Sequence, residues 1–331
     1  MVFSEKRKKW LEAIRCAEEA MEREISRAVG LEYIPSPMFV RDMSGVNDDL
    51  NGEEPVRFQT SDGEWCSVVH SLAKWKRWML WKLRDDGVNG IWCDMRGIRK
   101  CEDADVICTS RIHSYQVEQF DWEKVIPSEK RNIEFLKETV REIYRGLKAA
   151  KERVDAEYPG MFLRNKLADE VRFVQSQELE ELFPELNAQE RENAIAREAG
   201  SVFIIGIGHP LKSGREHGQR SADYDDWDLN GDLIVWNEVI GCGMEVSSMG
   251  IRVDHTSLRR QLEAKNESHK AEYEFHRGVL EGVIPPTIGG GIGKNRVVMF
   301  LLEARHIGEI QASVWPKKVH EECEGEGIHL L

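Results

Sequence analysis

The sequence lacks the patterns that mark several common classes of protein. Its seven cysteines are an odd number with no CxxC pair, so neither a disulfide framework nor a zinc site is predicted, and the thiols are expected to be reduced. The ten histidines include no HExxH spacing. No apolar run approaches the roughly 18 residues of a membrane span, and "MVFSEKRKKW" is too charged for a signal peptide. We therefore expect a cytoplasmic location and no membrane partner.

Positively charged residues are also fewer than negatively charged ones. Lysine and arginine number 46 against 59 aspartates and glutamates, which gives a formal net charge of −13. Because binding to a phosphate backbone needs a basic face, this balance argues against nucleic acid as the main partner. The 41% hydrophobic and 32% charged content is typical of a soluble protein with a sizeable core. The length of 331 residues fits one large domain or two ordinary ones.

The order of the expected elements indicates one continuous domain. Apolar residues at helical spacing predict a first helix that ends at Gly30, and a clearer one that runs from Ser128 to Tyr158. The other expected elements are an edge strand in "LEYIPSPMFV", a hairpin over 56–71, strands over 90–100, 112–123, 172–179 and 201–208, a helix from near Asn187, two strands around Gly241–Gly243, and a polar helix Ser257–Glu281. We therefore predict a single α+β domain over residues 1–331 with an antiparallel sheet rather than βαβ units.

The stretch "IPPTIGGGIGKNRVVMFLLE", residues 284–303, concentrates glycine before an apolar helix. Glycine permits positive φ and close approach of another group to the backbone. Two interpretations compete, namely a tight packing turn and a floor against which a ligand lies. A dinucleotide-binding fingerprint is excluded, because it would follow a first strand, whereas these glycines lie close to the C-terminus.

Polar residues concentrate in four stretches. Ser71 and Lys76 follow an apolar strand, Gln119 and Asp121 share one face of another, and Arg296 follows the glycines. The other candidates are Arg99, Asp225, Asp232, Glu245 and Arg252. Separated arginines with carboxylates suit Mg²⁺–nucleotide chemistry, and the absence of a Walker lysine motif excludes a P-loop.

Each feature also has a plainer interpretation. "KWKRWMLWKLR" interleaves cations with tryptophans, as a nucleic-acid or membrane-surface helix would, but an ordinary amphipathic helix is favoured. The acidic residues Asp223–Asp228 are by themselves more typical of a solvated turn than of a metal site. None of these signals is specific by itself, and their spacing together predicts an α+β magnesium–nucleotide enzyme and little more.

The strings "VVHSLAKWKR", "HSYQVEQFDWE", "DYDDW", "LNGDLIVWN", "SSMGIRVD" and "TIGGGIGKNR" together resemble the ammonia-dependent, A-type asparagine synthetases, from about residue 10 to the C-terminus. That family is built on the catalytic core of class II aminoacyl-tRNA synthetases. The resemblance implies an antiparallel sheet flanked by helices, one catalytic domain, and a homodimer with Pro37 at its contact. It also implies conversion of L-aspartate, ATP and ammonia to L-asparagine, AMP and pyrophosphate through a β-aspartyl adenylate.

The resemblance further implies roles for individual residues. Arg99 and Gln119 would act in catalysis with Asp48, which would orient ammonium and help to remove its proton. Aspartate would be bound by Ser71, Lys76, Asp121, Ser248 and Arg252. The nucleotide would lie against Ser114, Val117, Asp225, Ser247, Gly291, Gly293 and Arg296. Mg²⁺ would be held by Asp232 and Glu245.

Some residues depart from the family pattern. Asp49 stands where the family has asparagine, Glu118 stands where an aspartate is expected, and the link between "DYDDW" and "LNGDLIVW" is short. The main rival is a paralogue of aspartyl- or asparaginyl-tRNA synthetase that acts on tRNA. A binding protein that lost catalysis is a third reading, disfavoured because Arg99, Arg296, Asp232 and Glu245 are all present. Valine at position 2 argues against a glutamine-dependent synthetase, which needs a cysteine there.

Overall fold

A computed structural model describes residues 4–48, 53–100, 106–107 and 110–331. Its centre is an eight-stranded sheet with the order β1-β5-β6-β11-β10-β9-β8-β7. The strands are β1 (Glu32–Tyr33), β5 (Gly90–Ile98), β6 (Gln116–Val125), β11 (Thr287–Gly293), β10 (Cys242–Arg252), β9 (Asp225–Asn237), β8 (Ser201–Ile205) and β7 (Arg172–Gln175). Neighbours from β5 to β8 are antiparallel, and only the edge strands β1 and β7 pair in parallel. The predicted antiparallel sheet is confirmed.

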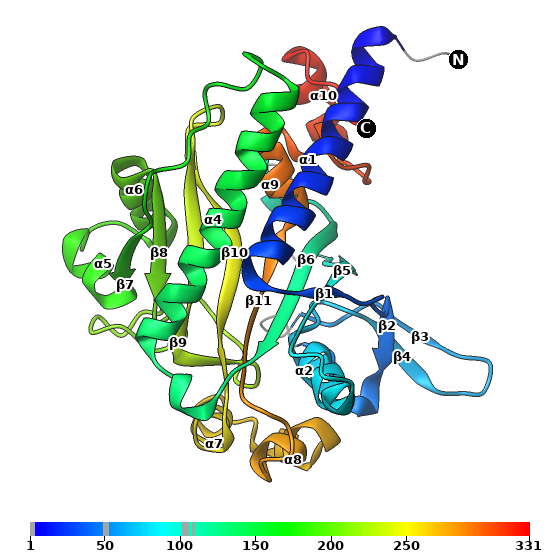
Figure 1. Ribbon diagram of the computed structural model, residues 1–331, viewed down its shortest axis with the longest axis vertical. Coiled ribbons are helices and arrows are strands. Elements are labelled where there is room, and N and C mark those ends of the chain that lie inside the picture. Colours follow the sequence, from blue (N-terminus) through cyan, green and yellow to red (C-terminus); the bar gives the residue numbers. More distant parts are fainter. Residues whose placement is uncertain (1–3, 49–52, 101–105, 108–109) are drawn as a thin grey trace.

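Helices α1 (Glu5–Val29), α4 (Ile133–Glu157) and α9 (Lys294–Leu301) cover one face of this sheet (Figure 1). Ser4 caps the start of α1, and Gly30 ends it with a φ of 76°. Asn132 caps α4, so residues 128–130 of the predicted long helix form a separate 3₁₀ turn, η3 (Ser128–Lys130). The apolar stripes of α1 and α4 bury against the sheet and form the largest core cluster.

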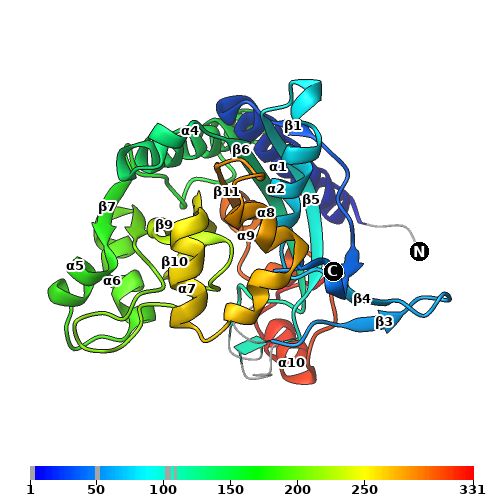
Figure 2. The same ribbon diagram turned by 90° about the horizontal axis from the view of Figure 1, so that it is seen from below.

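Shorter helices lie on the other side of the sheet and at its lower end in Figure 1, and Figure 2 shows the same helices from below. These helices are α2 (Ala73–Lys82), α5 (Ser176–Leu182), α6 (Ala188–Ala199), α7 (His255–Ala264) and α8 (Glu274–Leu280). The predicted continuous polar helix over 257–281 is wrong. It divides into α7 and α8, because Asn266 adopts left-handed backbone (φ 58°) and a 3₁₀ turn, η4 (Ser268–Glu272), follows. The start of α6 after Asn187 is confirmed.

Smaller elements complete the chain. The predicted hairpin is confirmed as β3 (Arg57–Gln59) and β4 (Trp65–Val68), and β2 (Phe39–Arg41) joins them in a three-stranded sheet. Short 3₁₀ turns are η1 (Asp42–Ser44), η2 (Arg84–Asp86) and η5 (Ile307–Glu309), and α10 (Lys317–Gly325) lies near the C-terminus. Asp49 and most of the acidic loop at 101–111 lie outside the described residues.

The structure bears on two expectations from the sequence, which concern membrane-spanning helices and cysteine thiols. No helix within the described residues is long and apolar enough to cross a membrane. The described cysteines, which are Cys16, Cys66, Cys93, Cys242 and Cys323, are free thiols.

The glycine-rich stretch is a strand in the middle of the sheet, so its interpretation as a tight turn is wrong. Residues 287–293 form β11, which pairs with β6 on one side and β10 on the other. A Cβ at Gly289 would lie 2.6 Å from the carboxyl carbon of Glu123, and one at Gly291 would lie 2.9 Å from Gln119. The glycines therefore make room for β6 side chains that lie across β11.

We expect Gly289→Ala to destabilise the fold strongly. Its methyl group would also meet the carbonyl oxygen of Trp122 at 2.6 Å, and neither a strand backbone nor the paired Glu123 can yield freely. The loss should be about 2–3 kcal/mol of unfolding free energy, measured by urea denaturation. Gly293→Ala is the matched control on the same strand, because its Cβ would meet only Arg296, at 3.6 Å. Equal midpoints for the two variants would contradict this account.

Candidate active site

Most cations of α2 point into the protein rather than to solvent, whereas Lys82 at its end is exposed. Lys74, Lys76 and Arg77 are all buried, so the segment differs from the ordinary amphipathic helix that the sequence favours. Lys76 is fully buried and pairs with Asp121, and its Nζ also donates to the carbonyl oxygens of Trp122 at 2.9 Å and Gly290 at 3.2 Å. Helix α2 is thereby bound to β6 and β11 through charge.

Arg252, at the end of β10, forms the second buried charge network. Its guanidinium donates to Glu123 at 2.7 Å and 3.0 Å and to Asp225 at 2.6 Å. Burial alone would lower the pKa of Arg252, but these two carboxylates raise it well above its usual range. Arg252 is therefore a permanent cation whose hydrogen-bonding groups are directed at protein carboxylates.

The register of four strands builds a polar row on the face away from α1 and α4. Asp121 lies opposite Gly291, Gly291 lies opposite Ser248, and Ser248 lies opposite Asp232. Directly opposed residues point to the same face of a sheet, and the intervening residues of β6 belong to the core under α1. Gln119 shares that face, and within the described residues its buried Oε1 has no hydrogen-bond partner. The alternation expected from the sequence therefore brings Gln119 and Asp121 together.

Asp48 and Ser71 lie at the N-terminal end of α2. The Asp48 carboxylate accepts hydrogen bonds from the Ser71 hydroxyl and from the backbone amides of Ala73 at 2.7 Å and Lys74 at 3.3 Å. The free amides and the helix dipole both favour an anion there. The amide of Leu72 donates to Asp121 at 3.1 Å, so the start of α2 also connects to the polar row.

The cations Arg99 and Arg296 lie near one another, on a different side of the site from Asp48. Arg99 follows β5, and one terminal nitrogen of its guanidinium donates to the carbonyl of His70 at 3.2 Å. Arg296, in the first turn of α9, donates to the carbonyls of Ile112 and Glu245 at 3.2 Å and 3.0 Å. Burial and the charge of Arg296 lower the pKa of Arg99.

The pKa of the neighbouring His113 is also affected by these two positive charges. Burial, reinforced by Arg296 and Arg99, lowers the pKa of His113 to about 3. The buried Nε of Arg99 has no hydrogen-bond partner in the part of the chain that the structure describes. Two like charges with an unused donor are the features of a site that binds an anion.

Asp232 and Glu245 carry the predicted metal site. Burial and the nearby charge of Asp232 raise the pKa of Glu245. Asp232 pairs with Arg220, and its Oδ1 has no described hydrogen-bond partner, whereas Glu245 lies 3.9 Å from Arg296. Among the described residues, no group of three or more His, Cys, Asp or Glu side chains is arranged to hold a metal ion. The arrangement offers two carboxylates and needs further oxygen ligands from elsewhere.

Three predicted nucleotide-binding residues lie apart from these clusters. Ser114 precedes β6 and donates to the hydroxyl of Ser313 at 2.8 Å. Val117 shares the face of Gln119 but packs in the apolar cluster beside α2. Ser247 lies opposite Ile292, which belongs to the core on the helix-covered face. The Ser247 side chain could contact a ligand on the polar row only if the local backbone conformation were different.

The acidic run at 223–228 is largely buried, so its interpretation as a solvated turn is wrong. Asp223, Asp225 and Asp226 are at most 6% exposed, and each pairs with a cation, namely Lys74, Arg252 and Arg131 respectively. Four residues without an assigned role in the sequence take part in these buried ion pairs. They are Glu123, Lys74, Asp223 and Arg220. Strand alternation from Asp121 points to Glu123, but no pattern along the chain identifies the other three.

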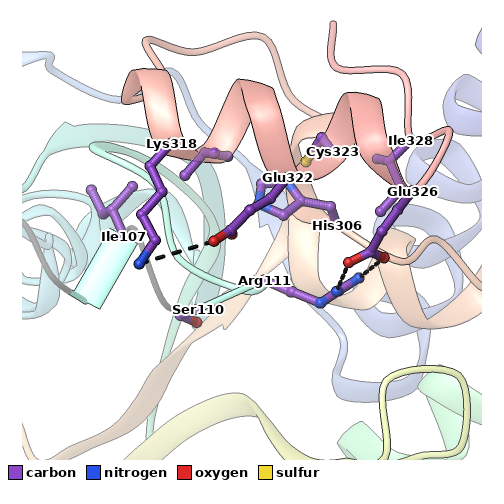
Figure 3. A pocket seen from close by; sticks show the side chains of 10 residues that line it. Ile107, Ser110, Arg111, His306, Lys318, Glu322, Cys323, Glu326 and Ile328 are labelled. Atoms are coloured by element: carbon purple, nitrogen blue, oxygen red, sulfur yellow. Dashed lines mark hydrogen bonds and ion pairs between the residues drawn. The ribbon is translucent and has the colours of Figure 1, made fainter.

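Pockets occur both at and away from these clusters. A pocket of about 310 Å³ is lined by Asp48, Lys74 and His70, among others, and so adjoins the site. A different pocket lies beneath α10, where Arg111 pairs with Glu326 at 2.9 Å and Lys318 lies 3.9 Å from Glu322 (Figure 3). Its charged side chains pair with one another, and it contains none of the predicted site residues.

The chain is similar to known proteins over almost its full length. The family model described as aspartate–ammonia ligase matches residues 8–327. An aspartate–ammonia ligase of Bacillus cytotoxicus is 47% identical over 321 residues, and one of Fusobacterium nucleatum is 47% identical over 320 residues, in each case covering 96% of both chains.

Solved structures show the same fold at much lower identity. An asparaginyl-tRNA synthetase of Pyrococcus horikoshii complexed with asparaginyl-adenylate has a TM-score of 0.65 at 16% identity, covering 93% of this chain and 70% of that one. The enzyme of Entamoeba histolytica, also with asparaginyl-adenylate, has a TM-score of 0.64 at 15% identity, covering 93% and 66%. These likenesses confirm the expected class II synthetase-like fold.

We expect Arg252→Met to destabilise the protein by about 3–5 kcal/mol, because it leaves Glu123 and Asp225 as buried carboxylates without a cation. The pKa of Asp225, which burial already raises against the opposing charge of Arg252, should then lie higher still, so the variant should gain stability relative to the wild type as pH falls from 7 to 5. Urea denaturation at several pH values measures both effects.

Arg172→Met is the matched control, since Arg172 pairs with Glu198 at a similar distance, 2.6 Å, but on the surface. It should cost less than about 1 kcal/mol with little pH dependence. A loss in Arg252→Met as small as that of the control would show that the buried network does not stabilise the fold.

Proposed function

Because the chain belongs to the aspartate–ammonia ligase family, we propose that it converts L-aspartate, ammonia and ATP to L-asparagine, AMP and pyrophosphate through a β-aspartyl adenylate. The observation that carries this proposal is 47% identity to aspartate–ammonia ligases over almost the full length of both chains. The chain is thus a ligase of asparagine biosynthesis. Its ATP use is consistent with its similarity in fold to synthetases that hold an aminoacyl adenylate.

The triphosphate binds toward Arg99 and Arg296 in this proposal. The unused Nε of Arg99 and the mutual repulsion of the two cations are both relieved by an anion. The β-carboxylate of aspartate attacks the α-phosphorus, and pyrophosphate leaves. Arg99 stabilises the negative charge that grows on the α-phosphate oxygens during that step. Arg296 holds the phosphates farther from the reacting centre.

Mg²⁺ fits Asp232 and Glu245. Two carboxylates completed by phosphate oxygens form the oxygen-rich set that Mg²⁺ prefers, and no third protein carboxylate is required. Burial and, after it, repulsion from Asp232 raise the pKa of Glu245, and a divalent cation would remove that repulsion. When bound, the ion neutralises phosphate charge.

Aspartate binds on the polar row. Asp121, which Lys76 holds in place, and Glu123, which Arg252 holds in place, are buried carboxylates and the acceptor candidates for its amino group. Ser71, Ser248 and Gln119 supply neutral hydrogen-bonding groups around the same face. Lys76 and Arg252 already contact protein carboxylates, so each can bind a substrate carboxylate only as a further partner of the same cation.

Amidation follows at the adenylate. The nitrogen of ammonia attacks the β-carbonyl carbon, the bond from that carbon to the phosphate oxygen breaks, and AMP leaves as an anion. Asp48 lies beside Ser71, at the same end of the row. We assign it to attracting and orienting ammonium and to helping remove its proton, because only neutral ammonia is nucleophilic.

A homodimer is supported by an exposed apolar surface near Pro37. Tyr33, Met38, Phe39 and Trp65 are 46–62% exposed on β1 and the three-stranded sheet. Large side chains gathered in this way are typical of a surface that a partner covers. We propose that the partner is a second copy of this chain.

A tRNA-dependent reaction is the alternative function. The neighbours in fold are tRNA synthetases, but their identity of 15–16% supports the fold only. The net charge of −13 and the ligase names of the near relatives favour ammonia as the acceptor.

A product assay tests the proposal directly. The protein is incubated with aspartate, ATP, Mg²⁺ and ammonium, and asparagine, AMP, ADP and pyrophosphate are measured. We expect asparagine and AMP in equal amounts, with no product when Mg²⁺ is omitted. Parallel reactions replace ammonium with glutamine or tRNA. Product that forms only with tRNA, or with ADP instead of AMP, would refute the proposed reaction.

We expect Arg99→Ala to lower aspartate-dependent ATP–pyrophosphate exchange by about 10²–10³-fold, since it removes charge stabilisation from the adenylation step. Arg96→Ala is the matched control, because Arg96 lies three residues earlier with an exposed side chain that is 3.6 Å from Asp94. It should retain exchange activity. Near-normal exchange in Arg99→Ala, with an unchanged unfolding midpoint, would remove Arg99 from the catalytic site.

A further inference from the structure

Arg220 is a largely buried cation that the proposed reaction does not use. It lies in the long connection between β8 and β9, residues 206–224. Three residues earlier, this connection is tied to α6, because Nε2 of His217 lies 3.1 Å from Glu192. The Arg220 side chain is 14% exposed, and its guanidinium pairs with Asp232. A charged group held in this way at the proposed metal site calls for a function.

Arg220 interacts with both carboxylates that we assign to Mg²⁺. A terminal nitrogen of its guanidinium donates to Oδ2 of Asp232. Burial alone would lower the pKa of Arg220, but Asp232, and after it Tyr224 and Glu245, raise it instead. The other carboxylate oxygen of Asp232, Oδ1, is buried and makes no hydrogen bond within the described residues. Arg220 therefore occupies one oxygen of Asp232 and leaves the other to a further partner.

Each of the two carboxylates is matched by its own arginine. Asp232 pairs with Arg220, and Glu245 lies 3.9 Å from Arg296. Because arginine stays protonated, these four groups carry no net charge when both carboxylates are ionised. A divalent cation that entered alone would leave two positive charges in excess within a largely buried site. It would also lose hydration water, which Mg²⁺ gives up reluctantly.

The surrounding charges do not alter this balance. Two further charged groups that interact with Glu245 are Glu192 and Arg99, and they have opposite signs. A divalent cation is therefore favoured at these carboxylates only when additional negative charge enters the site. The triphosphate is the anion that the proposed reaction supplies, and it binds toward Arg99 and Arg296.

We propose that Arg220 is a built-in counter-ion that keeps divalent metal ions from binding until ATP arrives, so that the metal binds together with the nucleotide. The inference rests on the proposed function, because it concerns the order in which that reaction's metal and nucleotide bind. Arg220 acts through Asp232 and is a positioning residue. Loss of its charge should strengthen metal binding by the nucleotide-free protein, whereas loss of a residue that only orients Asp232 would weaken it.

Arg220→Met tests this role, because it removes the charge and keeps an unbranched side chain. Mn²⁺ takes the same kind of oxygen ligands as Mg²⁺, and the electron paramagnetic resonance signal of the free ion measures its binding. Without nucleotide, we expect the Kd for Mn²⁺ to fall about tenfold relative to the wild type. Mn²⁺ should also raise the Tm of the variant more than that of the wild type. Arg220→Gln is a second neutral variant that retains a donor for Asp232, and it should behave in the same way.

Three further variants separate charge from other effects. Arg220→Lys keeps the charge and should bind Mn²⁺ as weakly as the wild type does. Arg215→Met is the matched control, because Arg215 lies in the same connection but is exposed, and it should leave the Kd unchanged. Asp232→Asn, added to Arg220→Met, should abolish the gain in binding and so locate it at this carboxylate.

The failure of this inference can be told from failure of the proposed function. Unchanged or weaker binding of Mn²⁺ in both neutral variants refutes the counter-ion role alone, provided that the wild type forms asparagine with Mg²⁺. A gain in binding that survives Asp232→Asn also refutes it, because the ion then binds elsewhere. Failure of the wild type to form asparagine from aspartate, ATP, Mg²⁺ and ammonium refutes the proposed function and this inference with it.

Discussion

Lys76 has no contact with solvent, so its ammonium group must be compensated within the protein. Asp121 supplies the countercharge, and two backbone carbonyls satisfy the remaining donors. Arg252 repeats this arrangement with Glu123 and Asp225. Desolvating these ions is unfavourable by several kcal/mol each, so the geometry of the pairs must be accurate for the fold to be stable. The same accuracy is what a site for a small charged amino acid requires.

The glycines of β11 leave the space that this charge pairing needs. A strand with ordinary side chains between β6 and β10 would fill the space that Glu123 and Gln119 occupy. The absence of side chains brings polar groups from β6 close to those of β10 and β9 on one face, while the opposite face remains a packed core. One strand thus serves both the core and the site.

The sequence predicted features that depend on local periodicity. Alternation along β6 correctly joins Gln119 with Asp121, and capping and turn residues give the start of α6 and the hairpin of β3 and β4. Features that depend on partners far along the chain were not predictable. The burial of the lysines in "KWKR" depends on their partners Asp121 and Asp223, and the glycine run could be read as a turn or a ligand floor until its two neighbouring strands are in place.

The separation of these partners along the chain has a consequence for how the protein reaches its active form. Lys76 contacts residues 45 and 214 positions away, and Arg252 contacts Glu123 across 129 positions. Bringing such distant segments together is entropically unfavourable and comes late in folding. The polar row therefore exists only after nearly the whole chain has assembled, and an incomplete or nicked chain carries unpaired buried charge instead of a functional site. Such species are readily degraded by proteases. The ion pairs therefore favour the persistence of molecules whose site is complete.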